Sequence, residues 1–333
     1  MRRFQGLENA GKASLLAGKA SLLVPRGAVK GAVVTWGVFD GVHRGHQQIL
    51  RDTLARAREV GGEAIVVTFD RHPRTVLTGV STPLLTSLPH RLALLERLGL
   101  DGAVVLPFDR DFAALSAEEF VRRVLVDSLS ARGVVAGYNT AFGRNREGNR
   151  TVLEALGARY GFSVYGSSPV HHRGQPISST RVREAILGGR LADAADLLGR
   201  PVSVLARVLR GAGRGRTIGF PTANLDLTGV VCPPRGVYAA LGRTGGVEYP
   251  ALVNVGRRPT FDGPEATETV EAHLVGFSGD LYDAEIEVEF HRKIRDERAF
   301  SSAQELARQI ACDRDALLAE SGLICLTGSP EGR

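Results

Sequence analysis

From residue 31 to about residue 168, short apolar runs alternate with longer amphipathic ones, and this alternation constrains the fold more than any other feature. The short runs have the length of buried strands, and the longer ones repeat apolar residues at helical spacing. The strand candidates are AVVTWGVF (32–39), EAIVVTF (63–69), GAVVLPF (102–108), RGVVAG (132–137) and FSVYGSS (162–168). One helix is expected to begin at Ser116 with a capping box to Glu119. The alternation predicts a parallel sheet with helices on both faces, which binds ligands beyond the carboxyl ends of its strands.

The pattern changes near residue 200. The stretch 179–200 has a helical pattern whose helix is expected to end at Gly199, and Pro201 follows. Beyond it, apolar and polar residues alternate in VSVLARVLR, GVYAALGR, EYPALVNVG, ETVEAHLVGF and EIEVEFHRKI. In the last stretch Ile286, Val288 and Phe290 face one way, and Glu285, Glu287 and Glu289 face the other. This half-solvated antiparallel pattern predicts a small β-barrel, followed by a helix near 301–319.

A chain of 333 residues is long for one compact domain, so we expect two. The predicted organisation is an N-terminal extension (1–28), an α/β Rossmann-like domain (29–187), a linker (188–200) and a barrel domain with a terminal helix (201–325). No run of about 18 apolar residues appears, and the N-terminal apolar runs are too short and broken for a signal peptide. The three cysteines lack zinc-site spacing, so we expect reduced thiols in a cytoplasmic protein without membrane attachment.

The net charge of +6 leaves two interpretations open. The arginines are spread along the chain without a block of about five or six like charges, which favours a solvated surface that attracts anionic small molecules. A protein that binds polyanions is the alternative. Binding of single-stranded RNA would need stacking aromatics among the basic residues, and aromatics make up only 6% of the chain. We therefore expect no nucleic-acid partner.

The stretch GVFDGVHRGH (37–46) lies where an apolar strand gives way to a predicted helix. A helix N-terminus offers free N–H groups and a partial positive charge to an anion. Gly45 would let a bulky ligand approach the backbone, and the imidazoles of His43 and His46 would lie on one helical face. They are interpreted as hydrogen-bond donors to a triphosphate. Zinc binding is an alternative, although two histidines form an incomplete ligand set. Purely structural histidines are another.

Two further segments have the composition of a phosphate site. ISSTRVREAI (177–186) places three hydroxyls before a helix, with Arg181 and Arg183 close behind. It is either a helix N-cap or a clamp in which hydroxyls and a guanidinium hold departing phosphates. Between it and the first motif lies GYNTAFGRNREGN (137–149), a strand end rich in glycine and asparagine that could also be a simple turn.

The glycine-rich stretch GAGRGRTIGFPTANLDL (211–227) matches neither a P-loop nor a dinucleotide fingerprint. It is interpreted as a phosphate-binding loop or, alternatively, a plain connection. Within it, Thr222 and Asn224 stand two residues apart, so in an extended segment both side chains point the same way. A hydroxyl and an amide oxygen suit Mg²⁺. Glu271, among strand residues expected to be buried, is a candidate general base or one more solvent-facing glutamate.

GVFDGVHRGH, VVTFDRHP, GYNTAFG and ISSTRVR, in this order, resemble the N-terminal module of the bacterial bifunctional riboflavin kinase/FMN adenylyltransferase (FAD synthetase) family. The resemblance implies the reaction FMN + ATP → FAD + pyrophosphate, carried by His43, His46 and Arg183, with Asn139 orienting the flavin or ATP. It further implies that ATP phosphates contact a set of residues from two of these motifs. They are Gly37, Phe39, Asp40, Gly41, Gly45, Ser178, Ser179 and Thr180.

GRGRTIGFPTANL, PRGVYAA, NVGRRPTF, VEAHLVGFSGDLY and IRDERAF resemble the riboflavin kinase module of the same family, a six-stranded barrel. The implied reaction is riboflavin + ATP → FMN + ADP, with Glu271 as the catalytic base and Thr222 and Asn224 on Mg²⁺. By the same resemblance, two sets of residues bind the substrates. They are Gly213, Arg216, Gly219 and Pro221 for the nucleotide, and Asn254 and Arg295 for the flavin.

The resemblance therefore implies an enzyme of flavin cofactor biosynthesis that takes riboflavin, FMN and ATP, requires Mg²⁺, releases FMN and FAD, and is a monomer or weak homo-oligomer. Two alternatives stay open. Thr140, where an aromatic is usual, and Arg71, where a proline is typical, would suit a riboflavin kinase with an impaired adenylyltransferase. A flavin-binding regulatory protein is the other, although it would not need a base beside a metal.

Overall fold

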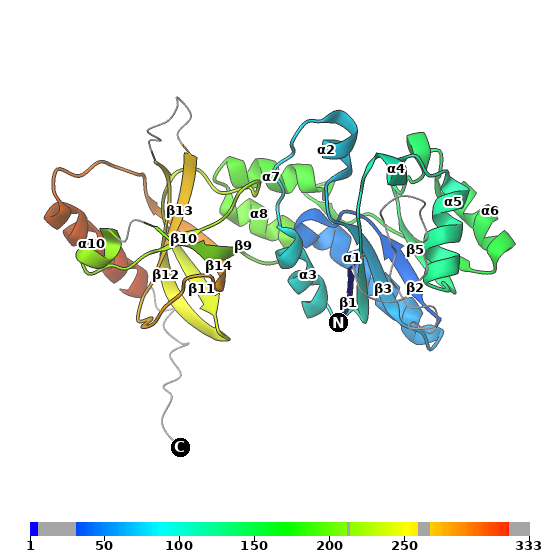
Figure 1. The fold of residues 1–333 in the computed structure, drawn as a ribbon, viewed down its shortest axis with the longest axis horizontal. Coiled ribbons are helices and arrows are strands. Elements are labelled where there is room, and N and C mark those ends of the chain that lie inside the picture. Colours follow the sequence, from blue (N-terminus) through cyan, green and yellow to red (C-terminus); the bar gives the residue numbers. More distant parts are fainter. Residues whose placement is uncertain (6–30, 212–213, 259–266, 320–333) are drawn as a thin grey trace, which may run out of the picture. The chain divides into compact units, whose positions relative to one another are not determined.

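The computed structural model describes residues 1–5, 31–211, 214–258 and 267–319 (Figure 1). They form two compact units. Unit 1 comprises residues 1–83 and 88–179, and unit 2 comprises residues 84–87 and those from 180 onward. Residues 84–87 belong to unit 2 because the Leu84 amide donates to the Gly229 carbonyl at 2.8 Å and the Leu84 carbonyl accepts from the Val231 amide at 2.8 Å.

Unit 1 is built on a six-stranded sheet whose strand order is β1-β4-β3-β2-β5-β6. Every pairing in it is parallel. The strands are β1 (Arg2–Gln5), β2 (Val33–Trp36), β3 (Ala64–Phe69), β4 (Gly102–Leu106), β5 (Gly133–Gly137) and β6 (Ser163–Ser167). The chain runs outward from β2 through β3 to β4 and then returns to place β5 on the other side of β2. The switch point for ligand binding therefore lies beyond the ends of β2 and β5.

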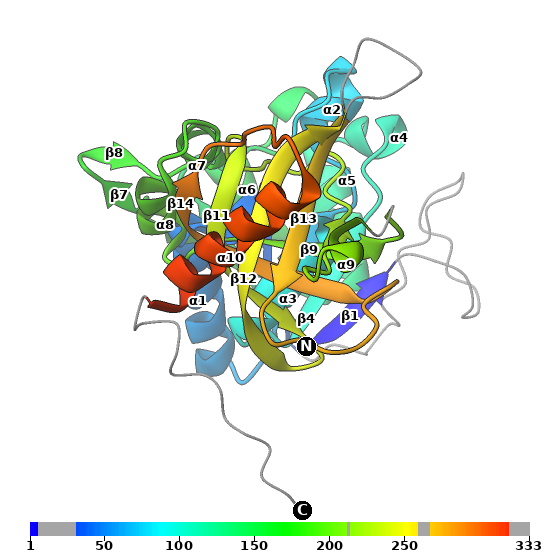
Figure 2. The same cartoon turned by 90° about the vertical axis from the view of Figure 1, so that its left-hand side faces the viewer.

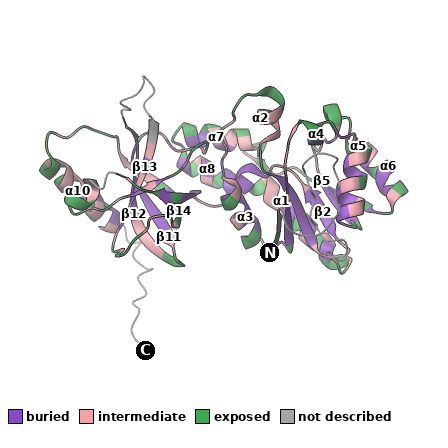
Figure 3. Ribbon diagram, viewed as in Figure 1, coloured by how far each residue is buried: buried purple, intermediate pink, exposed green. Residues whose placement is uncertain are grey.

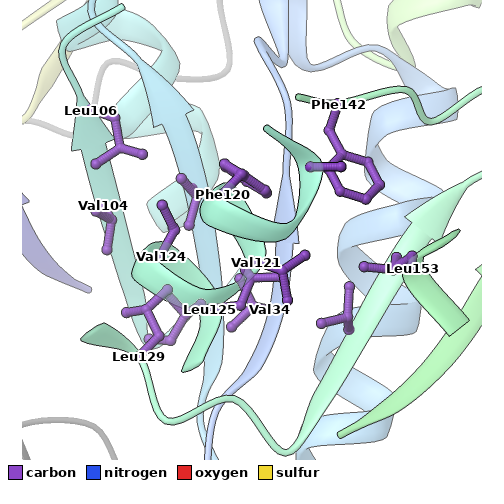
Figure 4. Close-up of a cluster of buried hydrophobic side chains, with 14 of the residues drawn as sticks. Val34, Val104, Leu106, Phe120, Val121, Val124, Leu125, Leu129, Phe142 and Leu153 are labelled. Carbon is purple, nitrogen blue, oxygen red and sulfur yellow. The ribbon is translucent and has the colours of Figure 1, made fainter. Parts of the chain in front are cut away.

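Helices cover both faces of this sheet, as predicted (Figure 3). Val33 and Val66 pack with α1 (Arg44–Glu59) and α3 (Leu88–Arg97) on one face. On the other face, shown in Figure 4, Val34 and Val104 pack with α5 (Ala117–Phe120), η2 (Val121–Ser128) and α6 (Arg150–Tyr160). Because both faces are buried, the four inner strands β2, β3, β4 and β5 have continuous apolar runs rather than alternating ones. The remaining elements of unit 1 are η1 (Asp40–Val42), α2 (Pro73–Thr78), α4 (Arg110–Ala113), η3 (Arg144–Arg146), β7 (His171–His172) and β8 (Gln175–Pro176).

Several helices and strands differ from the sequence prediction. The capping box at Ser116 is present in both directions, but the helix that it starts changes to a π-helix at Val121. The helical stretch over 179–200 is two helices, α7 (Ser179–Leu187) and α8 (Leu191–Leu198), because Gly189 adopts a φ of +71° between them. The edge strand β1 lies in the predicted N-terminal extension and was not expected.

Unit 2 contains a closed six-stranded barrel of order β10-β13-β12-β11-β14-β9, with all pairings antiparallel (Figure 2). Its strands are β9 (Val202–Leu209), β10 (Ala223–Leu225), β11 (Gly236–Thr244), β12 (Val247–Arg258), β13 (Thr267–Leu274) and β14 (Glu285–Arg295). A short helix, α9 (Arg214–Thr217), precedes β10. The terminal helix α10 (Ala303–Ala319) packs Leu317 against Val237 and Leu252 of the barrel. The predicted barrel with a C-terminal helix is confirmed, although the three-residue strand β10 was missed.

The half-solvated pattern predicted for β14 is wrong at Glu287, which is only 4% exposed. The guanidinium of Arg243 supplies the compensating charge. Its Nη1 lies 4.0 Å from Glu287 and 2.5 Å from Glu289, and its Nε pairs with Glu248. A buried carboxylate requires such a partner, and the alternation of residue types along a strand does not reveal one.

Candidate functional site

The turn that joins β2 to α1, residues 37–42, has an unusual backbone. Phe39 and Val42 adopt φ values of +51° and +41°, and Gly41 adopts +79°. The left-handed region is unfavourable for a bulky or β-branched side chain, and such strain persists only where surrounding contacts hold it. Here the Gly37 amide donates to the Val67 carbonyl at 3.0 Å. The Gln47 side-chain amide donates to the Val42 carbonyl, also at 3.0 Å. The strain lies at the switch point of the sheet, where a ligand is expected.

The two predicted histidines are stacked at the start of α1. Their ring centroids are 3.6 Å apart with planes 15° from parallel, and the Nδ1 atom of His43 accepts from the backbone N–H of His46 at 3.2 Å. His43 is therefore the helix cap. Burial, followed by the nearby charges of His43 and Arg91, lowers the pKa of His46 well below its ordinary value. Its imidazole is neutral at neutral pH and can donate from only one nitrogen.

The neighbourhood of His46 leaves one polar atom uncompensated. Its Nδ1 atom is buried and has no hydrogen-bond partner among the described residues. Phe39 packs edge-on against the same ring at 5.2 Å. A Cβ atom at Gly45 would lie 3.2 Å from the His43 ring, so glycine suits this close approach. Across the described ranges, no group of three or more His, Cys, Asp or Glu side chains is arranged to hold a metal ion.

One hydrogen bond connects the hydroxyl-rich motif, residues 177–186, to the 37–42 turn. Ser179 Oγ donates to the backbone carbonyl of Asp40 at 2.9 Å. Ser179 is also the first residue of α7, which carries Thr180 and Arg183 in its first turns, and Ser178 directly precedes it. The Ser179 hydroxyl therefore joins the two motifs.

Asn139 follows β5, the neighbour of β2 in the sheet. A Cβ atom at Gly137 would lie 3.6 Å from the Thr140 hydroxyl, 3.8 Å from Asn139 Oδ1 and 3.1 Å from Ile49 of α1. Asn139 and Thr140 thus fold back over the end of β5. Asn139 is exposed there, beside the switch point where the 37–42 turn begins.

Arg91 of α3 lies beside the 37–42 turn, although no sequence motif indicated it. The guanidinium donates to the Val38 carbonyl at 2.7 Å and to the Phe69 carbonyl at 2.6 Å, and the residue is 2% exposed. The only signal in the sequence was a charged residue within the apolar helical stretch HRLALLE.

In unit 2 the barrel register aligns three predicted site residues on neighbouring strands. Asn224, Glu271 and Asn254 are together called the row. Glu271 of β13 lies opposite Asn224 of β10 on one side and opposite Asn254 of β12 on the other. Thr222 Oγ1 donates to Glu271 Oε2 at 3.2 Å. A hydroxyl, a carboxylate and two amides therefore gather at neighbouring positions. These oxygen donors have the chemistry that Mg²⁺ prefers.

A cavity of about 260 Å³ lies beside this row. Arg216, Pro221 and Thr222 line it together with Gly215 and the segment 277–282. Gly215 is needed there because a Cβ atom would lie 2.3 Å from the Phe220 carbonyl oxygen. Gly219, with a φ of +85°, does not line the cavity, and Gly213 lies outside the described residues.

His273 also lies beside the row, although no sequence motif indicated it. It stands two residues after Glu271 on β13, and its Nδ1 atom is 2.8 Å from the Pro221 carbonyl oxygen. The His273 ring also packs edge-on against Phe220, with centroids 5.5 Å apart. His273 thus holds the backbone directly before Thr222. Its place on the same strand face as Glu271 was the available signal.

Arg295, predicted to bind flavin, is engaged by Asp313 of α10. Its Nε lies 3.2 and 3.0 Å from the two carboxylate oxygens, and its Nη2 is 2.9 Å from one of them. Asp313 is 3% exposed. Val237 of β11 is paired with Arg295 of β14 on one side and with Asn254 of β12 on the other. Arg295 therefore lies two strands away from Asn254. The guanidinium anchors the terminal helix to β14.

Two protein-family models match successive parts of the chain. Residues 26–181 match the family described as FAD synthetase, and residues 198–319 match the family described as riboflavin kinase. Curated relatives are similar across both. A bifunctional riboflavin kinase/FMN adenylyltransferase of Escherichia coli K12 is 40% identical over 287 residues, which is 85% of this chain and 91% of the relative. One from Bacillus subtilis is 35% identical over 289 residues, or 85% and 90%.

A solved structure is also similar over most of its length. It is described as a macrolide-efflux protein from Streptococcus pneumoniae, and it has a TM-score of 0.74 and 32% identity. The similarity covers 87% of this chain and 94% of that one. Within the described residues, no helix combines the length and the apolar character that crossing a membrane requires.

Proposed function

The chain belongs to the bifunctional riboflavin kinase/FMN adenylyltransferase family, and from this premise we propose which of its residues perform each reaction. The barrel domain phosphorylates riboflavin to FMN with ATP, and the α/β domain, which includes Thr180 and Arg183, transfers the adenylyl group of a second ATP to FMN, giving FAD and pyrophosphate. The hydrogen bond between Thr222 and Glu271 carries the proposal for the kinase, because it joins the Thr222 hydroxyl to the row that holds the base. The proposed domain bounds are 29–187 and 201–325, with 188–200 as the linker.

In the proposed kinase reaction, Glu271 accepts the proton of the terminal ribityl hydroxyl. The hydroxyl oxygen then attacks the γ-phosphorus of ATP, and the bond to the β-phosphate oxygen breaks. Thr222 and Asn224 supply the oxygen atoms that would hold Mg²⁺. Bound there, the ion would neutralise charge on the transferred phosphate. The cavity beside the row takes the nucleotide, with Arg216 and Pro221 in its wall.

In the proposed adenylyl transfer, a phosphate oxygen of FMN attacks the α-phosphorus of ATP, and pyrophosphate leaves. This chemistry needs positioning and charge stabilisation more than covalent participation by the protein. His43 and His46 donate hydrogen bonds to ATP phosphates, and the neutral state of His46 makes it a donor rather than a cation. The family resemblance assigns Thr180 and Arg183 to the departing phosphates and Asn139 to the flavin.

The alternative of a kinase without adenylyl transfer is not favoured. It rested on Arg71 and Thr140, yet both lie within the segment that matches the FAD synthetase family model. Arg71 is exposed, and its Nε lies 3.9 Å from Asp70. We place both reactions in the cytoplasm, in keeping with Cys232 and Cys312, which form no disulfide among the described residues.

The test is a time course with purified protein, riboflavin, Mg²⁺ and excess ATP, in which riboflavin, FMN and FAD are separated by chromatography. We expect FMN to appear and then to give way to FAD. Omission of Mg²⁺ should stop the first step. If FMN accumulates, and supplied FMN is not converted, the adenylyl transfer assignment is wrong. If riboflavin is not consumed, the kinase assignment is wrong.

A further inference from the structure

Arg91 ties together the ends of two adjacent strands of unit 1. Its Nη1 donates to the carbonyl of Val38, two residues beyond β2, and its Nη2 donates to the carbonyl of Phe69, the last residue of β3. The fork of a guanidinium matches two acceptors at once, which a single ammonium does not. Because Val38 lies just beyond β2 and Phe69 ends β3, these hydrogen bonds hold the backbone where the two strands end.

The backbone directly after Val38 is the strained part of the 37–42 turn. Phe39 adopts its positive φ immediately after the carbonyl that Arg91 holds. The same Val38 carbonyl accepts a second side-chain hydrogen bond, from Thr68 Oγ1 at 3.1 Å. Two residues further on, the Asp40 carbonyl is held by Ser179. Strained backbone requires such outside contacts, and Arg91 supplies the shorter of the two on Val38.

The guanidinium keeps its charge in this position. Burial lowers the pKa of Arg91 to about 10, while Asp40 and Asp70 act in the opposite direction. Protonation is therefore nearly complete at neutral pH. A buried charge is seldom retained without a role in structure or function. No step of the proposed reactions uses Arg91.

We propose that Arg91 is a positioning residue for adenylyl transfer, which holds the 37–42 turn in the conformation that receives the ATP phosphates. The inference rests on the proposed function of unit 1. Displacement of catalytic groups by about 1 Å can lower a rate about 100-fold. Loss of this bridge should therefore act on kcat/KM for ATP and not only on stability.

The experiment compares Arg91→Met and Arg91→Lys with Arg97→Met, an exposed arginine on the same helix. Steady-state kinetics of FAD formation from supplied FMN give kcat and KM for ATP, and riboflavin phosphorylation is measured on the same samples. Trp36 is the sole tryptophan of the chain and packs between Phe120 and Phe142 in unit 1. Its fluorescence without flavin reports whether unit 1 is folded.

We expect Arg91→Met to lower kcat/KM for adenylyl transfer about 30- to 100-fold. Arg91→Lys, which keeps the charge and loses the fork, should lower it at least about five-fold. The kinase reaction and Arg97→Met should match the wild type. A folded Arg91→Lys with wild-type kcat/KM overturns the inference. If neither Arg91 variant folds, Thr68→Val tests the bridge instead, because it removes the other side-chain hydrogen bond on the Val38 carbonyl. A fall of about three-fold supports the bridge, and an unchanged value overturns it. A wild type that makes no FAD from FMN would instead contradict the proposed function itself.

Discussion

The Ser179 hydroxyl donates to the Asp40 carbonyl at 2.9 Å, and the two residues are separated by 139 positions in the sequence. This hydrogen bond places the start of α7 against the strained turn that leads into the two histidines. It links the GVFDGVHRGH and ISSTRVR motifs of the first site. Removal of the Ser179 hydroxyl oxygen abolishes it.

Ser179→Ala should therefore impair adenylyl transfer alone. Loss of one hydrogen bond to a backbone carbonyl corresponds to about a three- to ten-fold decrease in kcat/KM for ATP. Kinetics of FAD formation from FMN check this expectation, with FMN formation as the reference in the same sample. Ser163→Ala, an exposed serine on β6, is the matched control and should leave both rates unchanged.

The lowered pKa of His46 makes the stability of unit 1 depend on pH. The unfolded chain binds a proton on this side chain below about pH 6.5, whereas the folded protein binds it only at a lower pH. More protons are bound in the unfolded state within that window. The free energy of unfolding therefore rises with pH, by at most about 1.4 kcal/mol per pH unit from this one group.

His46→Asn should remove this contribution. Unfolding followed by Trp36 fluorescence between pH 5 and pH 8 compares the slopes, with exposed His171→Asn as control. A slope below pH 6.5 that is equal in His46→Asn and the wild type would rule out a lowered pKa for His46.

Glu271→Gln should separate the two activities. An amide cannot accept the ribityl proton, so FMN formation should decrease about 100- to 10,000-fold. Conversion of supplied FMN to FAD should persist at the wild-type rate. Chromatography of both reactions measures the two effects together. Substantial FMN formation by the variant would show that Glu271 is not the base.

Thr222→Val removes the hydroxyl beside the row with little change in volume. We expect riboflavin phosphorylation to decrease at least about ten-fold, and the Mg²⁺ concentration for half-maximal rate to rise. Titration of Mg²⁺ at saturating ATP measures both changes. The control is Thr228→Val, because Thr228 is exposed and bonds only Asp226 among the described contacts. An unchanged Mg²⁺ dependence would argue against metal binding by Thr222.

Asp313→Asn tests whether Arg295 serves mainly as an anchor for α10. Removing the charge of a buried partner destabilises a protein by about 3 kcal/mol. Calorimetry should show a lower Tm for unit 2, while the Trp36 signal of unit 1 is unchanged. Asp315→Asn on the exposed side of the same helix should change neither. A wild-type Tm in Asp313→Asn would contradict the anchoring role.

The types of elements and the motifs were readable from the residue pattern alone. Apolar runs buried on both faces and alternation at period two distinguish a parallel sheet from an antiparallel barrel, because each pattern follows from which faces of a strand are buried. Motif order was enough to assign both modules. His43, His46, Thr222, Asn224 and Glu271 were all proposed as site residues on local chemistry and resemblance, without strand order.

How distant segments meet became known from the folded chain and not from the residue pattern. The row Asn224–Glu271–Asn254 depends on barrel register, and β10 at three residues is too short for a periodic signal. In the sequence, Arg91 looks like any other arginine in a helix. Its two carbonyl partners, on Val38 and Phe69, are 53 and 22 residues away along the chain. Local periodicity reflects burial, whereas register, strand order and buried charge pairs arise from contacts between segments that share no local pattern.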